Sequence, residues 1–132
     1  MVGDIIVGAH GKLENKRILS VEGGVPQIEV TVSQSGKIHW IDVSKLVTYL
    51  SIPNGDGTIY AEGEGVIMIK GDDEAITWIG KISGQTRKDV GSALFNTSSN
   101  NGRLSFLNNT VGVFEFFAEG DGTVKGTIWE WK

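Results

Sequence analysis

The sequence predicts an all-β protein, built as one up-and-down antiparallel β-barrel of about eight strands. Runs of alternating apolar and polar residues recur along the chain, clusters of Gly, Asn, Asp and Ser separate them, and no stretch keeps a helical period. The chain has 19 glycines, several of them inside predicted strands, where glycine marks a sharp bend or a close backbone approach. Small barrels need such positions to turn their corners, and closure removes exposed sheet edges, so a barrel is favoured over a sandwich.

Five strands are predicted in the first half of the chain. Gly-Gly-Val-Pro at 23–26 separates the first two, and a second turn is expected at Ser35-Gly36. Pro-Asn-Gly-Asp-Gly at 53–57 is a strong reversal signal, because Asn-Gly and Asp-Gly supply the positive φ angles of hairpin turns. The predicted strands cover residues 17–22, 27–33, 38–52, 58–70 and 75–83.

The second half repeats this organisation. Turn residues at 98–102 and at 119–122 separate further alternating runs. The one weak helical candidate in the chain, residues 42–50, is rich in β-branched residues and lies inside a predicted strand. The predicted strands of this half cover residues 92–97, 103–107, 111–118 and 123–131.

Composition limits the domain count and the classes of partner. A chain of 132 residues suits a single domain, residues 1–132, and the sequence leaves open a loose arrangement for residues 1–12. The net charge of -4, with no basic patch, argues against a nucleic-acid partner. No apolar run approaches the roughly 20 residues of a membrane helix, so no membrane partner is expected. The first residues lack the features of a signal peptide, and we expect a cytoplasmic protein.

Cofactor and metal sites are not expected. Cysteine is absent, which excludes thiol nucleophiles and Cys-ligated metals. The two histidines are His10 and His39; His39 has Asp42 close by in the sequence but no third metal ligand. No dinucleotide fingerprint, phosphate loop or nucleophile elbow occurs, so the sequence predicts no cofactor.

The strand at residues 58–70 contains the main candidates for chemistry. Side chains two residues apart share a strand face, so Tyr60, Glu62 and Glu64 lie on one face and an Ile/Ala/Gly series lies on the other. An enzyme would aim the glutamates into the barrel, where loss of water raises a carboxyl pKa and makes a general acid or base. The alternative, favoured because buried glutamate is costly, puts the glutamates outside and the glycines in the core. Which face points inward stays open.

The glycines of this strand have two interpretations. Gly63 and Gly65, with Gly80 on the next strand, remove side chains from one face of a narrow barrel. A barrel of about eight strands either holds one small ligand or is filled by its own side chains. The aromatic residues available to line or fill that space include Trp78, Phe114 and Phe116.

Two tryptophans near the end of the sequence are a further aromatic feature. Trp129 and Trp131 share one face of the last predicted strand. Such a pair can line an apolar pocket, with its indole N–H groups orienting a polar atom of a ligand. Because the pair lies on the last strand, we expect it to close one end of the barrel.

Four segments resemble a known group of proteins. Residues 58–68, 75–80, 111–115 and 129–132 are similar to small uncharacterised prokaryotic proteins whose fold is that of the allene oxide cyclase barrel, a calycin-like up-and-down β-barrel. Residues 111–124 also resemble a segment of the plant cyclases and dirigent proteins, although Phe116 and Phe117 stand where that segment has small residues. The resemblance implies the fold more than the chemistry.

Three hypotheses for function follow. The first is a binding module that holds a small apolar or amphipathic ligand in the barrel, with a carboxylate or indole fixing its polar end. The second is a cyclase or isomerase of the allene oxide cyclase kind, which holds a reactive substrate in one shape. The third is a filled barrel that acts by self-association, as a homo-oligomer, or by partner contact. Candidate catalytic residues are Glu62, Glu64 and Glu115; candidate ligand-binding residues are Tyr60, Glu62, Glu64, Trp78, Phe114 and Phe116.

Overall fold

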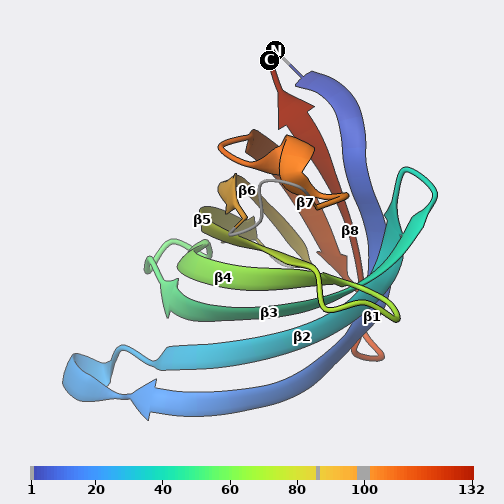
Figure 1. Cartoon of the computed structure of the whole chain (residues 1–132). Helices are drawn as coiled ribbons and strands as arrows, with labels where there is room; N and C mark the ends of the chain where they lie inside the picture. The colour runs from blue at the N-terminus through green and yellow to red at the C-terminus, as the bar shows by residue number, and fades with distance from the viewer. Residues whose placement is uncertain (1, 86, 98–101) are drawn as a thin grey trace.

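Eight antiparallel strands form a closed barrel in the computed structural model, which describes residues 2–85, 87–97 and 102–132. Each strand pairs with the next along the chain and the last pairs with the first, so the predicted up-and-down barrel is confirmed (Figure 1). The strands are β1 (Val2–Ser20), β2 (Gln27–Ile38), β3 (Ile41–Pro53), β4 (Ile59–Ile69), β5 (Ala75–Gln85), β6 (Lys88–Asn96), β7 (Val111–Ala118) and β8 (Thr123–Trp131), with short 3-10 turns η1 (Glu22–Gly24) and η2 (Ser105–Leu107). No helix in the described ranges has the length and apolar character needed to cross a membrane.

The N-terminal segment is part of the barrel wall. Residues 2–12, for which a loose arrangement was open, lie within β1 and pair with β8 from Val2 opposite Trp131 to Lys12 opposite Thr123. From Val7 onward β1 also pairs with β2, so one bent strand joins both neighbours and closes the barrel. The two ends of the chain consequently lie side by side (Figure 1). Glycines and a register irregularity interrupt the alternation in this segment, which hides the strand from pattern reading.

Hairpin turns follow the predicted reversal signals in two places. Between β3 and β4, Gly57 has a φ of 90° and the Asp56 carboxylate accepts the Thr58 backbone N–H at 3.0 Å. The same Asp-Gly-Thr arrangement recurs between β7 and β8. The expected turn at Ser35-Gly36 is wrong: both residues lie inside β2, and the chain reverses at residues 39–40, where His39 has a φ of 56°.

A predicted strand proves to be the cap of the barrel. Residues 103–107 form no strand in the structure; they contain η2, and Leu104 and Leu107 are buried in the core. The Glu74 carboxylate holds this segment by accepting the backbone N–H groups of Arg103 at 2.8 Å and Leu104 at 2.5 Å. The sequence pattern did not distinguish the two structures, because two leucines three residues apart are compatible with a helical turn as well as with a strand.

The two C-terminal tryptophans do not close the barrel, contrary to expectation. On β8 the buried positions are Gly126 and Ile128, so Trp129 and Trp131 point to the opposite, outer face. Trp131 is consequently 52% exposed. The short η2 segment provides the cap in their place.

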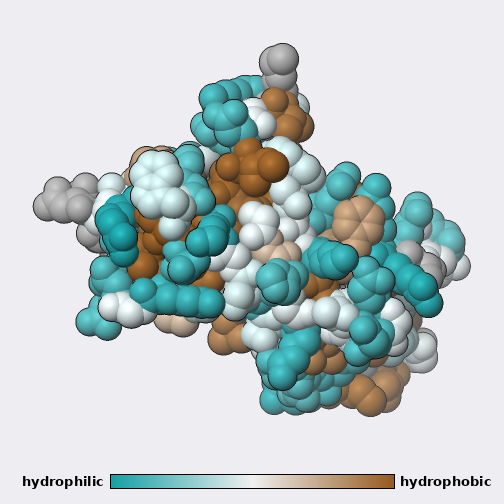
Figure 2. Space-filling view, turned by 90° about the vertical axis from the view of Figure 1, so that its right-hand side faces the viewer, coloured by the Kyte–Doolittle hydropathy of each residue, from teal (hydrophilic) through white to brown (hydrophobic). Residues whose placement is uncertain are grey.

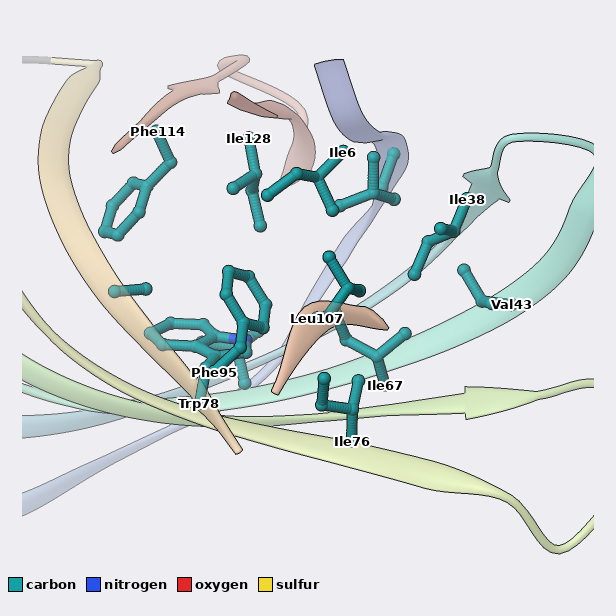
Figure 3. Close-up of a cluster of buried hydrophobic side chains, with 14 of the residues drawn as sticks. Ile6, Ile38, Val43, Ile67, Ile76, Trp78, Phe95, Leu107, Phe114 and Ile128 are labelled. Carbon is teal, nitrogen blue, oxygen red and sulfur yellow. The ribbon is translucent and has the colours of Figure 1, made fainter. Parts of the chain in front are cut away.

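Alternation of inward and outward residues defines the core. On β4 the buried face consists of Ala61, Gly63, Gly65, Ile67 and Ile69, while the residues between them are exposed or half-buried. The face that the sequence left open is therefore settled, with the glycines inside. Figure 3 shows buried side chains from all around the wall converging on the barrel interior, with Trp78 and Phe95 close together.

Large aromatic side chains occupy the space that the glycines leave. A Cβ atom added at Gly65 would overlap the indole of Trp78, and one added at Gly126 would overlap the ring of Phe116. The rings of Trp78, Phe114 and Phe116 form a chain, with centroids 5.9 Å and 4.9 Å apart. The centre of the barrel is thus filled by aromatic residues that lie against glycine.

Replacing Gly65 by Ala tests this packing. We expect a loss of about 1–3 kcal/mol in the free energy of unfolding, since the added methyl group must displace a fully buried indole. Chemical denaturation of the full chain measures it, with Gly8→Ala as control because a Cβ at Gly8 meets nothing within 4 Å. The same change in a Trp78→Phe background should cost less, and equal losses at positions 65 and 8 would contradict the packing.

Candidate functional site

The three candidate carboxylates lie on the outside of the barrel. Glu62 and Glu64 are exposed on β4; Glu62 accepts a hydrogen bond from the Tyr60 hydroxyl at 2.6 Å and lies 3.8 Å from the Lys81 ammonium. Glu115, on the outer face of β7, lies 3.7 Å from Lys88. All three carboxylates therefore lie outside the enclosed interior where the enzyme hypothesis would place its acid or base.

The three candidate aromatic residues lie on the inside. Trp78, Phe114 and Phe116 are buried and contribute to the filled centre. The predicted ligand-binding set is therefore divided by the barrel wall: Tyr60, Glu62 and Glu64 form one outer cluster, and the aromatic residues form another inside. Trp78 also has an indole N–H that is buried and has no hydrogen-bond partner among the described residues.

Two buried polar residues, Gln34 and Lys45, were missed by the sequence analysis. Both point inward, and they are directly opposite each other in the β2–β3 register. A detectable signal was present, because Lys45 stands between Val43 and Val47, two apolar residues on the same strand face. A lysine at that position has its side chain on the same face as the two valines, and so in the core.

The surroundings of Gln34 and Lys45 are apolar. Gln34 is 4% exposed and Lys45 is 2% exposed. The side-chain amide of Gln34 and the Nζ of Lys45 make no hydrogen bond with a described residue. The Lys45 Nζ lies 5.1 Å from the ring centroid of Phe116. Burial lowers the pKa of Lys45 to about 7, because an ammonium group loses its hydration in this environment.

A small cavity adjoins this pair. Its volume is about 20 Å³, and it is lined by Val32, Gln34, Val47, Tyr49, Asp89, Phe116 and Val124. That space accommodates about one water molecule. Lys45 is not itself a lining residue, but it neighbours three residues that are: Gln34 is its cross-strand partner, Val47 is the next inward residue of β3, and the Phe116 ring centroid is 5.1 Å from its Nζ.

The mouth of the cavity has two titratable groups. Asp89 and Tyr49 are half-buried, whereas Gln34 and Lys45 lie deeper. Burial raises the pKa of Asp89 to about 6. Burial, and secondarily the charge of Asp89, raises the pKa of Tyr49 to about 12. At neutral pH this site therefore combines an uncharged phenol and a carboxylate at the mouth with an amine that is partly neutral inside.

The outer surface has two shallow grooves. The larger, about 880 Å³, is lined by residues of β1 to β7 and has Ile79, Leu94 and Val111 beside Glu62, Glu64 and Lys81. The smaller, about 530 Å³, lies beside Trp129. On the face that Figure 2 shows, apolar side chains reach the surface in separate patches between hydrophilic ones. No described group of three or more His, Asp or Glu side chains is arranged to hold a metal ion.

Comparison with known proteins identifies the fold. No protein-family model and no curated protein sequence matches the chain. A solved structure described as the conserved protein of unknown function RPA1785 from Rhodopseudomonas palustris is similar, with a TM-score of 0.73 and 10% sequence identity over 98% of this chain and 97% of that one. At this identity the similarity concerns the eight-stranded antiparallel barrel alone. The chain is thus a small β-barrel protein, similar in fold to a protein described as of unknown function.

The pH dependence of stability tests the burial of Lys45. Between pH 7 and 10.5 the unfolded chain keeps the proton on this lysine and the folded chain releases it, so the free energy of unfolding rises with pH, by at most about 1.4 kcal/mol per pH unit. Lys45→Met removes this contribution, so we expect the variant to be the more stable protein at pH 6 and its advantage to shrink by pH 9.

Urea denaturation from pH 6 to 9 measures the difference between the wild type and this variant. Lys81→Met is the matched control, because Lys81 is exposed on the outer face. If the free energy of unfolding had the same pH dependence in the wild type and in Lys45→Met, the Lys45 amine would be hydrated and not buried.

Proposed function

We propose that the barrel binds a small amphipathic molecule, with an oxygen-bearing polar group of the ligand directed at Gln34 and Lys45. The supporting observation is the set of buried hydrogen-bonding atoms on these two side chains that have no partner among the described residues. Buried polar groups in folded proteins nearly always have a partner, whether protein, ordered water or ligand. A ligand oxygen could accept from both Nζ and the amide N–H.

The energetic cost of the pair supports a functional role. An unpartnered buried polar group costs about 1–3 kcal/mol, and a buried ammonium group costs more. A Leu and a Met in these positions would fill the same space without that cost. Residues that are less stabilising than an alternative at the same position occur most often at functional sites.

The lining suits an amphipathic ligand more than a purely apolar one. Val32, Val47, Phe116 and Val124 offer an apolar wall, and Gln34 offers both a donor and an acceptor. The ligand must be small, because the cavity volume is about 20 Å³; outward movement of the half-buried Tyr49 in its lining would enlarge it. A ligand that favours the conformation with Tyr49 moved outward would shift the protein toward that conformation.

The cyclase hypothesis receives less support. Glu62, Glu64 and Glu115, which would stabilise charge or move protons in it, lie on the outer face. Membership of the allene oxide cyclase-like group stays a prediction.

Titration with butyrate and with 1-butanol tests the proposal. We expect butyrate to shift the backbone amide NMR signals of β2 and β3 around Gln34 and Lys45, with butanol binding more weakly because it has no charge for the ammonium group. Loss of the charge-assisted hydrogen bond in Lys45→Met should weaken butyrate binding at pH 6.5 by about tenfold or more, since such a bond contributes about 1.5–3 kcal/mol.

Three variants complete this test. Gln34→Leu should also weaken butyrate binding, and Lys81→Met, which changes an exposed lysine, should not. Unchanged butyrate affinity in both Lys45→Met and Gln34→Leu, or no shifts at these strands at 50 mM butyrate, would contradict the proposed site.

Self-association through the larger outer groove is a second candidate, favoured by its exposed apolar side chains. Ile79 is 61% exposed and Leu94 is 44% exposed in that groove. The groove contains charges of both signs, Lys81 and Glu64, and Glu64 has no ion-pair partner among the described residues. A two-fold contact that sets Lys81 of one copy beside Glu64 of the other would pair both groups twice, since each copy presents both charges.

Sedimentation velocity over a hundredfold concentration range measures this association. We expect a concentration-dependent dimer that Ile79→Glu abolishes, because the change adds a carboxylate beside Glu64. Ile18→Glu is the control, since Ile18 is 67% exposed but lies outside the groove. A monomer at every concentration would rule out this second candidate and leave the interior site untouched.

A further inference from the structure

We propose that Lys45 forms a reversible imine with a small aldehyde that enters the interior cavity, which makes the barrel a carbonyl-binding protein. This inference deepens the proposed binding function and rests on it, because it names aldehydes as the ligand class of the same site. It depends on the position of one amine, its neighbours and the volume beside it.

The structure isolates this amine from the other lysines of the chain. The chain has nine lysines, and Lys45 is the single buried one; the other eight are exposed, and several of them lie beside carboxylates. The Lys45 Nζ makes no hydrogen bond or ion pair with a described residue and faces the ring of Phe116. An amine attacks a carbonyl carbon only in its neutral form, and an apolar site favours that form. At neutral pH, burial leaves Lys45 about half neutral, as its pKa of about 7 implies.

The reaction needs only the amine, the aldehyde and movable protons. The nitrogen lone pair attacks the carbonyl carbon, the C=O π bond breaks, and a proton passes from nitrogen to oxygen to give a carbinolamine. Loss of that hydroxyl as water forms the C=N bond, and addition of water reverses the sequence. No oxidant or reductant takes part.

Two neighbours could assist these steps. Gln34, opposite Lys45, has an amide N–H free to donate to the carbonyl oxygen as charge develops on it. Asp89 lines the same cavity, and burial raises its pKa to about 6, so near neutral pH it can deliver through a water molecule the proton that leaves with the hydroxyl. The apolar residues around the nitrogen limit the water that would hydrolyse the imine.

The volume of the cavity selects the aldehyde. About 20 Å³ holds one water-sized group, and a modest movement of Tyr49 admits a few more atoms. Aliphatic aldehydes of one to four carbons, the chain length of butyrate, satisfy this limit, whereas an aromatic aldehyde would have to displace Phe116, whose ring already lies against Gly126. The inference is therefore specific for small aldehydes.

Reductive trapping tests the inference on the full chain. The protein is incubated at pH 7 with 1 mM acetaldehyde and sodium cyanoborohydride, which reduces an imine to a stable secondary amine, and modified positions are found by peptide mapping. We expect the Lys45 adduct to form at least tenfold faster than the adduct at any exposed lysine. The rate of Lys45 labelling should reach half its maximum near pH 7 and then level off.

Variants and a larger probe sharpen the result. Lys45→Arg should remove this adduct and leave the labelling of the exposed lysines unchanged, with circular dichroism verifying the fold. Benzaldehyde should label Lys45 at least tenfold more slowly than acetaldehyde. Lys45 left unmodified while exposed lysines react would overturn the inference, and equal labelling by benzaldehyde would overturn its size selectivity.

Butyrate titration of the same preparation separates this inference from the function on which it rests. Butyrate shifts at β2 and β3 without a Lys45 adduct would mean that the cavity binds ligands but forms no imine. Neither butyrate shifts nor an adduct would mean that the cavity is closed to ligands, and both proposals would then fail.

Discussion

Pairing of β1 with β8 is the constraint on which the rest of this structure depends. It turns the sheet back on itself, so the inward faces of eight strands enclose one core of fixed width. An open sheet could accommodate a misplaced side chain by exposing it to water. In a closed barrel each inward position must be filled by a residue that fits against the strands across the interior.

Aromatic side chains and glycines share this limited width. Trp78 lies over Gly65, and Phe116 lies over Gly126. Each large ring thus occupies the space that a side chain on the neighbouring strand would otherwise fill. At the end closed by η2, Leu104 and Leu107 complete an apolar core. Between that core and the mouth, Gln34 and Lys45 break the apolar pattern. A filled barrel has no structural need for an amine there, and this is the physical reason to look for a ligand at that place.

Burial separates the chemistry of the two faces. Lys81 and Glu62 form an ion pair in water on the outside, where such a pair contributes little to stability. Lys45 has the same chemical group, but it is buried and has no ion pair or hydrogen bond with a described residue, so its proton is held weakly. Reactivity therefore follows from position in the barrel and not from residue type, and the acidic outer cluster that dominates the sequence pattern contributes mainly to the surface.

The sequence by itself determined the fold class, most strands and the hairpin turns at 53–57 and 119–122, because alternation and Asn-Gly or Asp-Gly signals are local properties of the chain. Local pattern did not reveal that residues 2–12 close the barrel or that residues 103–107 cap it, since both depend on contacts with strands distant in sequence. The candidate site also needed the tertiary structure. Alternation on β3 allows Lys45 to point inward, but only closure of the barrel surrounds it with Gln34, Phe116 and the far wall, and so removes the water that would otherwise hydrate an ordinary lysine.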